Sequence, residues 1–412
     1  MRRGYDKQRE EAFFALFRSY FDAEKDAGKQ HDPANYSLAR MTPLLALAGH
    51  PEQRLRVLHV AGTKGKGSTC HFIANLLSSA GRRVGLFTSP HLATVRERFE
   101  IDGALLSYER LTAFGRGFAD KVAAAGLEPS LFELFTVMAM ALFVCDGVEY
   151  AVLETGIGGR LDATNVVPKP CCTVITPVSF DHMALLGNSI EAIAGEKAGI
   201  IKAGVPLVLG KQPYAAAAAV IKARAAALGC EVLSPRALSA AERALLPAPC
   251  APFLLDNFAL ALTALDCLGV TPSLAAFRPP ELRARCEKIC DEPLVLLDAA
   301  HNADSMEKLC AALLALYPGQ RWTVVLGMVK GKDIKGMVQA LRVLPAEFIL
   351  TNPHTGKGSG LDELSGEMAQ AGLTVRAVIR DLQSKAELPV DRPLLFTGSF
   401  FTALIGEQLF NP

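Results

Sequence analysis

Short apolar runs alternate with longer amphipathic segments along most of this chain. A short apolar run bounded by glycine or polar residues is typical of a buried strand, whereas apolar residues at every third or fourth position are typical of a helix. The apolar runs predict strands at 57–60, 83–87, 150–154, 172–176 and 205–209. The amphipathic segments predict helices at 107–125, 130–145, 189–202, 213–228 and 256–268. This order predicts an α/β protein with a doubly wound, mainly parallel sheet.

The same pattern predicts two domains. Helices are predicted near the N-terminus at 5–30 and 34–49, and the pattern weakens at 270–292, which we interpret as a linker. A second series of predicted strands follows at 294–297, 322–327, 346–350 and 393–396. We therefore predict a larger domain with a phosphate-binding loop at 1–283 and a smaller, Rossmann-like α/β domain at 284–412.

A glycine-rich loop follows the first predicted strand, in the sequence VLHVAGTKGKGST at 57–69, and a helical segment comes next. Glycines let backbone N–H groups approach phosphate oxygens, the start of a helix adds partial positive charge, and a lysine can reach the outer phosphates. The spacing differs from the strict P-loop pattern, so an ordinary glycine turn with a solvated lysine is the alternative for this loop taken alone. The residues predicted to bind a nucleotide here are Gly62, Thr63, Lys64, Gly65, Lys66, Gly67, Ser68 and Thr69.

Three more polar or glycine-rich loops follow predicted strands. They are TSPHL at 88–92, TGIGGR at 155–160 and SFDH at 179–182. Ligands of doubly wound sheets bind where the parallel strands end, so we expect these loops to meet the glycine-rich loop in one crevice.

Composition and charge narrow the classes of function. The 412 residues contain 43 Lys plus Arg and 42 Asp plus Glu, so no overall charge favours nucleic acid or an anionic membrane as a partner. The N-terminal residues lack the apolar core of a signal peptide, and no apolar run is long enough to span a bilayer. The ten cysteines do not form a zinc-binding pattern, so free thiols in a reducing cytoplasm are expected.

Side chains at three predicted strand ends offer ligands for a magnesium ion. Glu154 ends an apolar strand, Ser89 follows another, and His182 lies in the SFDH loop. Mg²⁺ uses a few protein ligands and leaves the remaining positions to water and nucleotide phosphates. The alternative is that Glu154 caps a loop and His182 is an ordinary polar residue. Lys197 lies within a predicted helix, and the sequence pattern alone predicts a solvated side chain.

The predicted second domain also has polar residues at its first strand end. Asp298 and His301 lie in LLDAAHN, and a carboxylate at such a place commonly binds ribose hydroxyls. Arg285, in the linker, could reach a phosphate. We therefore expect both domains to contact one nucleotide, in a site that closes when the domains move together.

Taken together, these motifs resemble the folylpolyglutamate synthase and dihydrofolate synthase family, within the Mur ligase superfamily of ATP-dependent amide ligases. The similarity extends over nearly the whole chain in family order. It includes VAGTKGKGST, GLFTSPHL, FELFTVMA, LETGIGGRLDATNVV, SFDHMALLGNSIEAIAGEKAGIIK, LLDAAHN and TGSFF. Four residues differ from the family pattern: Lys64 replaces an asparagine, Gly331 replaces an acidic residue, and Phe253-Leu254 replaces His-Gln.

The resemblance implies a role for each candidate residue. Lys66 and its loop would bind the ATP triphosphate, and Ser89, Glu154 and His182 would hold Mg²⁺. Lys197 would be carbamylated and would supply a carboxylate to a second magnesium ion. The ATP site would be completed by Asn257, Arg285, Asp298 and His301. Lys66, His182 and Lys197 are thus the predicted catalytic residues.

The resemblance also implies a reaction. ATP would phosphorylate a carboxylate of a folate or of dihydropteroate, and L-glutamate would attack the acyl phosphate to form an amide, with release of ADP and phosphate. The implied partners are these small molecules only, and the implied assembly is a monomer. One alternative is a Mur-type ligase acting on a non-folate acceptor, and another is a non-catalytic ATP-binding switch that releases no ADP.

Overall fold

The computed structural model describes residues 6–22, 37–248, 250–353, 358, 360–389 and 391–410. The chain divides into two compact units. The first unit comprises Tyr5–Ala248 and Leu254–Pro280, and the second consists mainly of Glu281–Pro412. No helix among the described residues is both long enough and apolar enough to cross a membrane.

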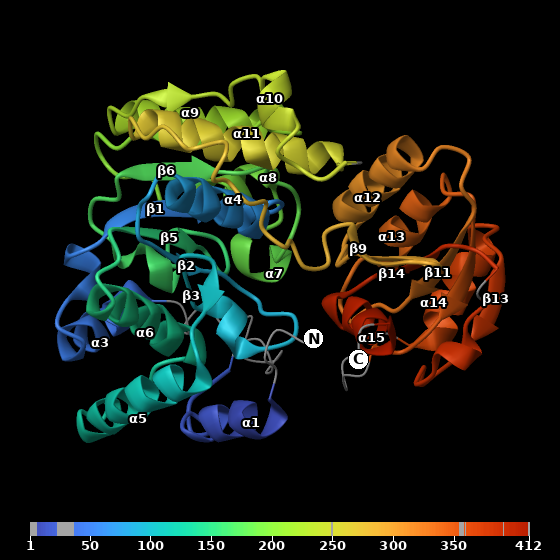
Figure 1. Ribbon diagram of the computed structural model, residues 1–412, viewed down its shortest axis with the longest axis horizontal. Coiled ribbons are helices and arrows are strands. Elements are labelled where there is room, and N and C mark those ends of the chain that lie inside the picture. The colour runs from blue at the N-terminus through green and yellow to red at the C-terminus, as the bar shows by residue number, and fades with distance from the viewer. Residues whose placement is uncertain are drawn as a thin grey trace. The chain divides into compact units, whose positions relative to one another are not determined.

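The first unit is built on an eight-stranded sheet in the order β4-β3-β2-β5-β1-β6-β7-β8. Figure 1 labels β3, β2, β5, β1 and β6 of this sheet. Six strands of the sheet pair in parallel, and the short β3 near one edge pairs antiparallel with both β2 and β4. The strands are β1 (Arg56–Ala61), β2 (Val84–Phe87), β3 (Glu100–Ile101), β4 (Ala104–Leu105), β5 (Tyr150–Glu154), β6 (Cys172–Ile175), β7 (Leu207–Leu209) and β8 (Val232–Leu233). The predicted α/β class with a mainly parallel sheet is confirmed.

Helices lie on both faces of this sheet. The α-helices are α1 (Lys7–Ala15), α3 (Met41–Leu47), α4 (Lys66–Ser79), α5 (Tyr108–Ala124), α6 (Leu131–Cys145), α7 (Met183–Leu186), α8 (Ile190–Ala198), α9 (Ala215–Ala227), α10 (Ala240–Arg243) and α11 (Pro252–Cys267). Short 3₁₀ helices are η2 (Leu38–Arg40), η3 (Pro51–Gln53), η4 (Val95–Arg98) and η5 (Ala163–Val166). Serine caps fix two of the helix starts, because Ser107 and Ser130 accept hydrogen bonds from the first turns of α5 and α6.

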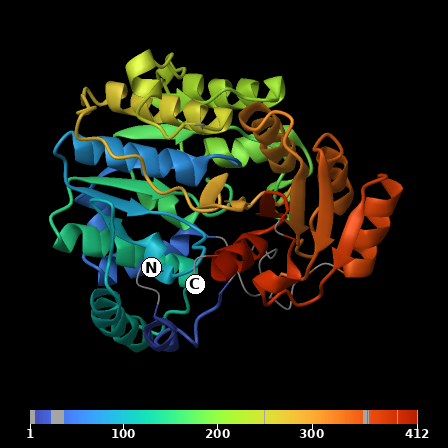
Figure 2. The ribbon, with the colours of Figure 1, turned by 45° about the vertical axis from the view of Figure 1, so that its right-hand side comes forward.

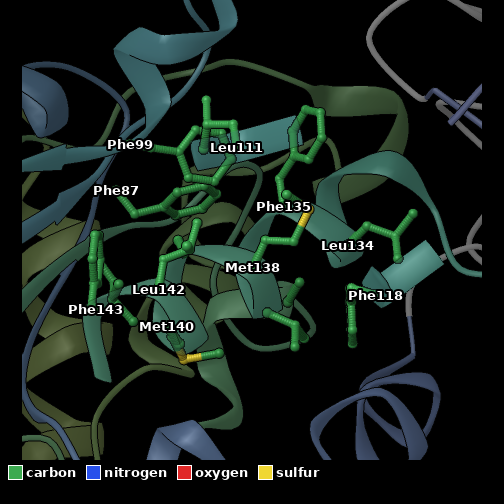
Figure 3. Packing of buried hydrophobic residues seen from close by; sticks show 14 of the residues in the cluster. Phe87, Phe99, Leu111, Phe118, Leu134, Phe135, Met138, Met140, Leu142 and Phe143 are labelled. Atoms are coloured by element: carbon green, nitrogen blue, oxygen red, sulfur yellow. The ribbon is translucent and has the colours of Figure 1, made fainter. Parts of the chain in front are cut away.

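The largest core cluster lies between one sheet face and α1, α3, α5 and α6. The ring centroid of Phe135 in α6 is 5.6 Å from that of Phe99 and 5.7 Å from those of both Phe13 and Phe17. Figure 3 shows Phe135 and Phe99 among the residues of this cluster. Gly85 of β2 has no side chain where the Phe143 ring approaches the strand, since a Cβ there would lie 2.6 Å from that ring. The N-terminal helix is therefore an integral part of this core.

The second unit has a six-stranded sheet in the order β13-β12-β11-β14-β10-β9, in which only β9 is antiparallel. Helices α12, α13 and α14 pack on one face, and α15, the red helix in Figure 2, packs on the other through Gly406 against Leu297 and Phe396. The strands are β9 (Glu287–Asp291), β10 (Leu294–Leu297), β11 (Trp322–Leu326), β12 (Ala346–Leu350), β13 (Val375–Val378) and β14 (Leu394–Thr397). The helices are α12 (Ala303–Leu316), α13 (Ile334–Leu341), α14 (Leu361–Gln370), η6 (Lys385–Glu387) and α15 (Phe400–Phe410).

Two predictions of local structure were wrong. The helix predicted at 5–30 ends at Ala15, because the chain then turns so that the Phe17 ring packs against Phe135; residues 23–36 lie outside the described part. The linker predicted at 270–292 contains strand β9, whose pairing with β10 fills the sheet edge. The domain limits 1–283 and 284–412 remain a prediction.

Candidate active site

The four predicted loops follow neighbouring parallel strands. Strands β2, β5, β1 and β6 are adjacent in the sheet, so their carboxyl ends lie along one edge. Hydrogen bonds join the loops that leave them. The backbone N–H groups of Thr63 and Lys64 donate to Pro177 O at 3.0 and 3.2 Å, and Thr63 Oγ1 exchanges hydrogen bonds with the Ser179 backbone. The loops therefore leave one edge of the sheet, and their convergence on a single crevice remains a prediction.

The glycine-rich loop has no room for side chains at two positions. A Cβ on Gly62, which has φ +147°, would lie 1.9 Å from Thr176 Oγ1, and a Cβ on Gly65, at φ +81°, would lie 2.3 Å from Asn257 Oδ1. Helix α4 begins directly after Gly65 with no side chain capping its first turn. Such an uncapped helix start after a glycine turn can serve as a cradle of backbone N–H groups for a phosphate, and Asn257 of α11 lies against Gly65.

Two hydroxyl groups in the first turn of α4 also fit an anionic ligand. The side chains of Ser68 and Thr69 are buried, and their hydroxyl oxygens have no hydrogen-bond partner among the described residues. Buried polar groups without a partner are uncommon in folded proteins and call for a ligand or a bound ion. The loop geometry and these hydroxyls together fit a nucleotide phosphate better than an ordinary glycine turn.

Lys66, Ser89 and Glu154 lie together at the ends of β1, β2 and β5. The Glu154 side chain is 4% exposed; its Oε2 accepts a hydrogen bond from Ser89 N at 3.1 Å, and its Oε1 lies 3.9 Å from Lys66 Nζ. A buried carboxylate is costly unless it is paired with a cation. Gly67 allows this approach, since a Cβ there would already contact Glu154 Oε2 at 3.4 Å.

His182 lies on the loop after β6, in the left-handed conformation with φ 49°. Its Nε2 is 3.9 Å from Asp181 Oδ1, and Asp181 Oδ2 is 3.8 Å from Lys64 Nζ. Among the described residues, no group of three or more His, Cys, Asp or Glu side chains is close enough together to hold a metal ion. The structure therefore brings Ser89 to Glu154 and puts His182 on the neighbouring loop.

Lys197 is buried, which corrects the solvated lysine that the sequence pattern predicted. It is 4% exposed, and its Nζ donates a hydrogen bond to Gly62 O at 2.8 Å. Burial, helped by the charges of Lys66 and Lys64, lowers the pKa of Lys197 to about 7. The signal was present in the sequence, because Ile190, Ile193 and Lys197 follow the spacing of the buried face of α8.

Residues that the sequence analysis missed hold the TGIGGR loop. Asp162 is buried and accepts backbone hydrogen bonds from Gly156 at 2.8 Å, Ile157 at 3.0 Å and Thr164 at 3.0 Å. Burial raises the pKa of Asp162, and the hydrogen bonds oppose that rise. Thr164 Oγ1 is in turn 2.7 Å from Nε2 of the buried His59.

A second set of contacts ties the same loop to α8. The Arg160 side chain donates to Glu196 Oε1 from Nε at 3.0 Å and from Nη2 at 2.8 Å, and its backbone N–H donates to Glu196 O. Gly159 packs so closely that a Cβ would lie 3.0 Å from Lys197 O. The loop and the helix that carries Lys197 therefore form one rigid assembly.

The candidate residues of the second unit form their own group. The Asp298 oxygens accept hydrogen bonds from Cys286 N at 2.9 Å and Ala300 N at 2.8 Å. Burial raises the pKa of Asp298, and the nearby Arg285 charge opposes that rise. Arg285 lies over the Phe400 ring at 5.1 Å, and the His301 ring is 6.2 Å from the same ring. Phe400, at the start of α15, is an aromatic member that the sequence analysis missed.

Comparison with known proteins gives matches in both units. Residues 60–208 match the Mur ligase middle domain, and residues 284–392 match the glutamate ligase domain of Mur ligases. The dihydrofolate synthase/folylpolyglutamate synthase of Bacillus subtilis is 35% identical over 80% of this chain and 84% of its own. The folylpolyglutamate synthase of Lacticaseibacillus casei is 33% identical over 88% of this chain and 92% of its own.

Solved structures agree with these relatives. Folylpolyglutamate synthase of Mycobacterium tuberculosis, complexed with ADP, superposes with a TM-score of 0.84 at 26% identity, over 98% of this chain and 99% of its own. A bifunctional folylpolyglutamate synthase/dihydrofolate synthase with Mn, AMPPNP and L-glutamate bound gives a TM-score of 0.78 at 29% identity, over 90% and 94% of the two chains.

The fold and the two family matches thus define the class, that of the Mur-type ligases. Within that class, the extent of the similarity to the relatives decides the family. The chain belongs to the folylpolyglutamate synthase and dihydrofolate synthase family.

Proposed function

We propose that this protein is an ATP-dependent ligase that adds L-glutamate to a carboxylate of a folate or of dihydropteroate. The substrate carboxylate attacks the γ-phosphorus of ATP, and ADP leaves. The glutamate amine then attacks the acyl phosphate, loses a proton and displaces phosphate to form the amide. The relatives are named as folate synthases, which supports a folate acceptor and gives no support to a non-folate one.

The observation that carries this proposal is the group of charged residues beside the phosphate cradle. Lys66 lies 3.9 Å from the buried Glu154 carboxylate, and Lys197 lies behind the loop on Gly62 O. Two anions must approach each other when a carboxylate attacks ATP, so the transferred phosphoryl group needs fixed positive charge. Lys66 supplies such a charge, and the loop N–H groups orient the phosphates.

The residues present also fit divalent cations. Carboxylate and hydroxyl oxygens suit Mg²⁺, and we propose Glu154, Ser89 and His182 as the ligands of one ion. Bound Mg²⁺ would neutralise charge on the phosphates. The relative with Mn and AMPPNP bound supports the use of a divalent ion and ATP in this family.

We propose further that Lys197 is carbamylated and serves a second ion. Only a neutral amine reacts with CO₂, and with a pKa of about 7 much of the Lys197 amine is neutral near neutral pH. Its burial beside Gly62 would also shield a carbamate from solvent. The ATP-binding roles of Asn257, Arg285, Asp298 and His301 remain predictions, and Asn257 is supported by its place against Gly65.

The assembly and the location are part of the proposal as well. We expect a monomer with small-molecule partners only. We expect it to act in the cytoplasm, and the ten cysteines, all free thiols, fit a reducing compartment.

The test is ADP release by the purified protein with ATP, Mg²⁺ and L-glutamate, comparing dihydropteroate with tetrahydrofolate as acceptor. Turnover with both acceptors identifies a bifunctional enzyme, and turnover with one names the activity. ATP binding without ADP release in the presence of either acceptor would refute the proposed ligase function. It would instead support a non-catalytic switch or another acceptor.

A further inference from the structure

Glu10 is a buried carboxylate in the N-terminal helix α1, and the proposed function gives it no role. Its side chain is 8% exposed, and it is on the face of α1 that also buries Phe13. Asp6 caps the helix by accepting a hydrogen bond from Arg9 N at 3.1 Å, which fixes where α1 begins. A carboxylate so far from water is costly unless several donors compensate it.

Three donors do so, and all come from outside α1. Glu10 Oε1 accepts a hydrogen bond from Val95 N at 2.8 Å, and Oε2 accepts one from Thr94 Oγ1 at 2.9 Å. Oε2 also accepts a hydrogen bond from the Tyr108 hydroxyl at the start of α5. Burial and then this hydrogen bond raise the pKa of Tyr108 to about 12, so the hydroxyl keeps its proton and remains a donor. Glu10 therefore joins α1 to two other segments.

The segment that Glu10 holds is the one that carries Ser89. At its beginning, Ser89 N donates to Glu154 Oε2 at 3.1 Å. In its middle, the Glu97 carboxylate accepts the backbone N–H groups of residues 92–94 at 2.7, 3.0 and 3.1 Å. At its end, the Glu10 carboxylate accepts a hydrogen bond from Val95 N. Three carboxylates thus hold the backbone from Ser89 to Val95: Glu154 at its beginning, Glu97 in its middle and Glu10 at its end.

An aromatic contact also joins α1 to this segment. The Phe14 ring of α1 lies 6.4 Å from the His91 ring, and His91 Nδ1 accepts a hydrogen bond from Arg98 Nε at 2.8 Å. Helix α1 therefore contacts the loop near Ser89 as well as its far end.

We propose that Glu10 is a positioning residue for the ligase reaction, which acts by holding the 89–95 segment so that Ser89 is kept beside Glu154. The inference rests on the proposed function, because it takes Ser89 as a ligand of the divalent ion. It gives the N-terminal helix a part in catalysis without any contact between that helix and a substrate.

The experiment measures Mn²⁺ binding by electron paramagnetic resonance in the presence of a non-hydrolysable ATP analogue, together with ligase turnover. It compares the wild type with Glu10→Gln, Ser89→Ala and the double variant. The matched control is Glu11→Gln, because Glu11 is the exposed neighbour, 4.0 Å from an exposed Lys7. A melting curve for each variant reports the stability of the fold separately.

Glu10→Gln is expected to raise the Mn²⁺ dissociation constant by roughly three- to tenfold, the effect of weakening one charge-assisted hydrogen bond. Glu11→Gln should change it by less than about twofold. In the Ser89→Ala background, Glu10→Gln should add no further weakening, since it acts through Ser89. If Glu10→Gln does not fold, Tyr108→Phe removes one donor, leaves the carboxylate in place, and should shift Mn²⁺ binding in the same direction.

Three results would overturn the inference. Unchanged Mn²⁺ binding in Glu10→Gln, with Ser89→Ala clearly weakened, would show that Glu10 only stabilises the fold, and the proposed function would stand. Equal weakening by Glu10→Gln with and without Ser89 would show that it acts by another route. If Ser89→Ala itself binds Mn²⁺ normally, the metal role of Ser89 fails and the inference fails with it.

Discussion

The burial of Lys197 predicts how the free energy of unfolding changes with pH. In the unfolded chain a lysine has a pKa of about 10.4, whereas burial gives Lys197 a pKa of about 7 in the folded protein. Between these values the unfolded state binds more protons than the folded state, so the free energy of unfolding rises with pH. Below about pH 7 both states are protonated, and the full penalty of the buried amine, roughly 5 kcal/mol, is present. It is relieved progressively as the pH rises toward 10.4.

The perturbation is Lys197→Met, which removes the titrating group and keeps most of the volume. It also removes the hydrogen bond to Gly62 O, but that loss does not depend on pH. From about pH 7.5 to about pH 9.5, the wild type should therefore gain roughly 2–3 kcal/mol of unfolding free energy relative to the variant. The exposed Lys169→Met is the control and should follow the wild type.

The assay is urea unfolding at a series of pH values in CO₂-free buffer without nucleotide or divalent ions. Circular dichroism follows both units, and fluorescence of the single tryptophan, Trp322, identifies the transition of the second unit. The transition of the first unit can then be assigned. If wild type and Lys197→Met show the same pH dependence across this window, Lys197 is not a buried, neutral amine and the reasoning is refuted.

Three other variants test the geometry of the first unit. Gly65→Ala should lose ATP binding in isothermal calorimetry, because a Cβ would lie 2.3 Å from Asn257 Oδ1 at a residue with φ +81°; normal affinity would contradict the phosphate cradle. Phe135→Ala should cost about 3–5 kcal/mol of unfolding free energy in urea, since its ring is at the centre of the aromatic cluster; a cost below about 1 kcal/mol would contradict the packing. Asp162→Asn should speed hydrogen exchange at Gly156, because an amide nitrogen would replace the oxygen that accepts the backbone N–H groups of Gly156 and Ile157. Unchanged exchange would contradict the hydrogen-bond network around Asp162.

Much of the fold could be predicted because short apolar runs between glycine-rich loops have few alternatives in a protein of this kind. Strands β1, β2, β5 and β6 were found this way. The helices predicted at 107–125 and 130–145 correspond to α5 and α6. Strand β9 was missed because its residues are mostly half-buried at a sheet edge, where the apolar signal is weak. The end of α1 at Ala15 depends on packing against distant aromatic residues, which local pattern does not encode.

The candidate site was predicted in the same uneven way. Lys66, Ser89 and Glu154 could be expected to meet, because the ends of adjacent parallel strands share an edge. The network around Asp162 could not, because nothing local marks which carboxylate turns inward to accept backbone N–H groups. For Asp298, the sequence located the strand end but gave no indication that its oxygens already accept two backbone hydrogen bonds.

The strand order of the first unit also affects how the chain folds during synthesis. The glycine-rich loop follows strand β1, but the two neighbours of β1 in the sheet, β5 and β6, start with Tyr150 and Cys172. At roughly 10 residues per second, the ribosome makes these partners about ten seconds after β1 emerges. During that interval the apolar strand has no sheet partner on either side and is open to pairing with other chains. The central place of β1 in the sheet therefore separates it, during synthesis, from both of the strands that it pairs with.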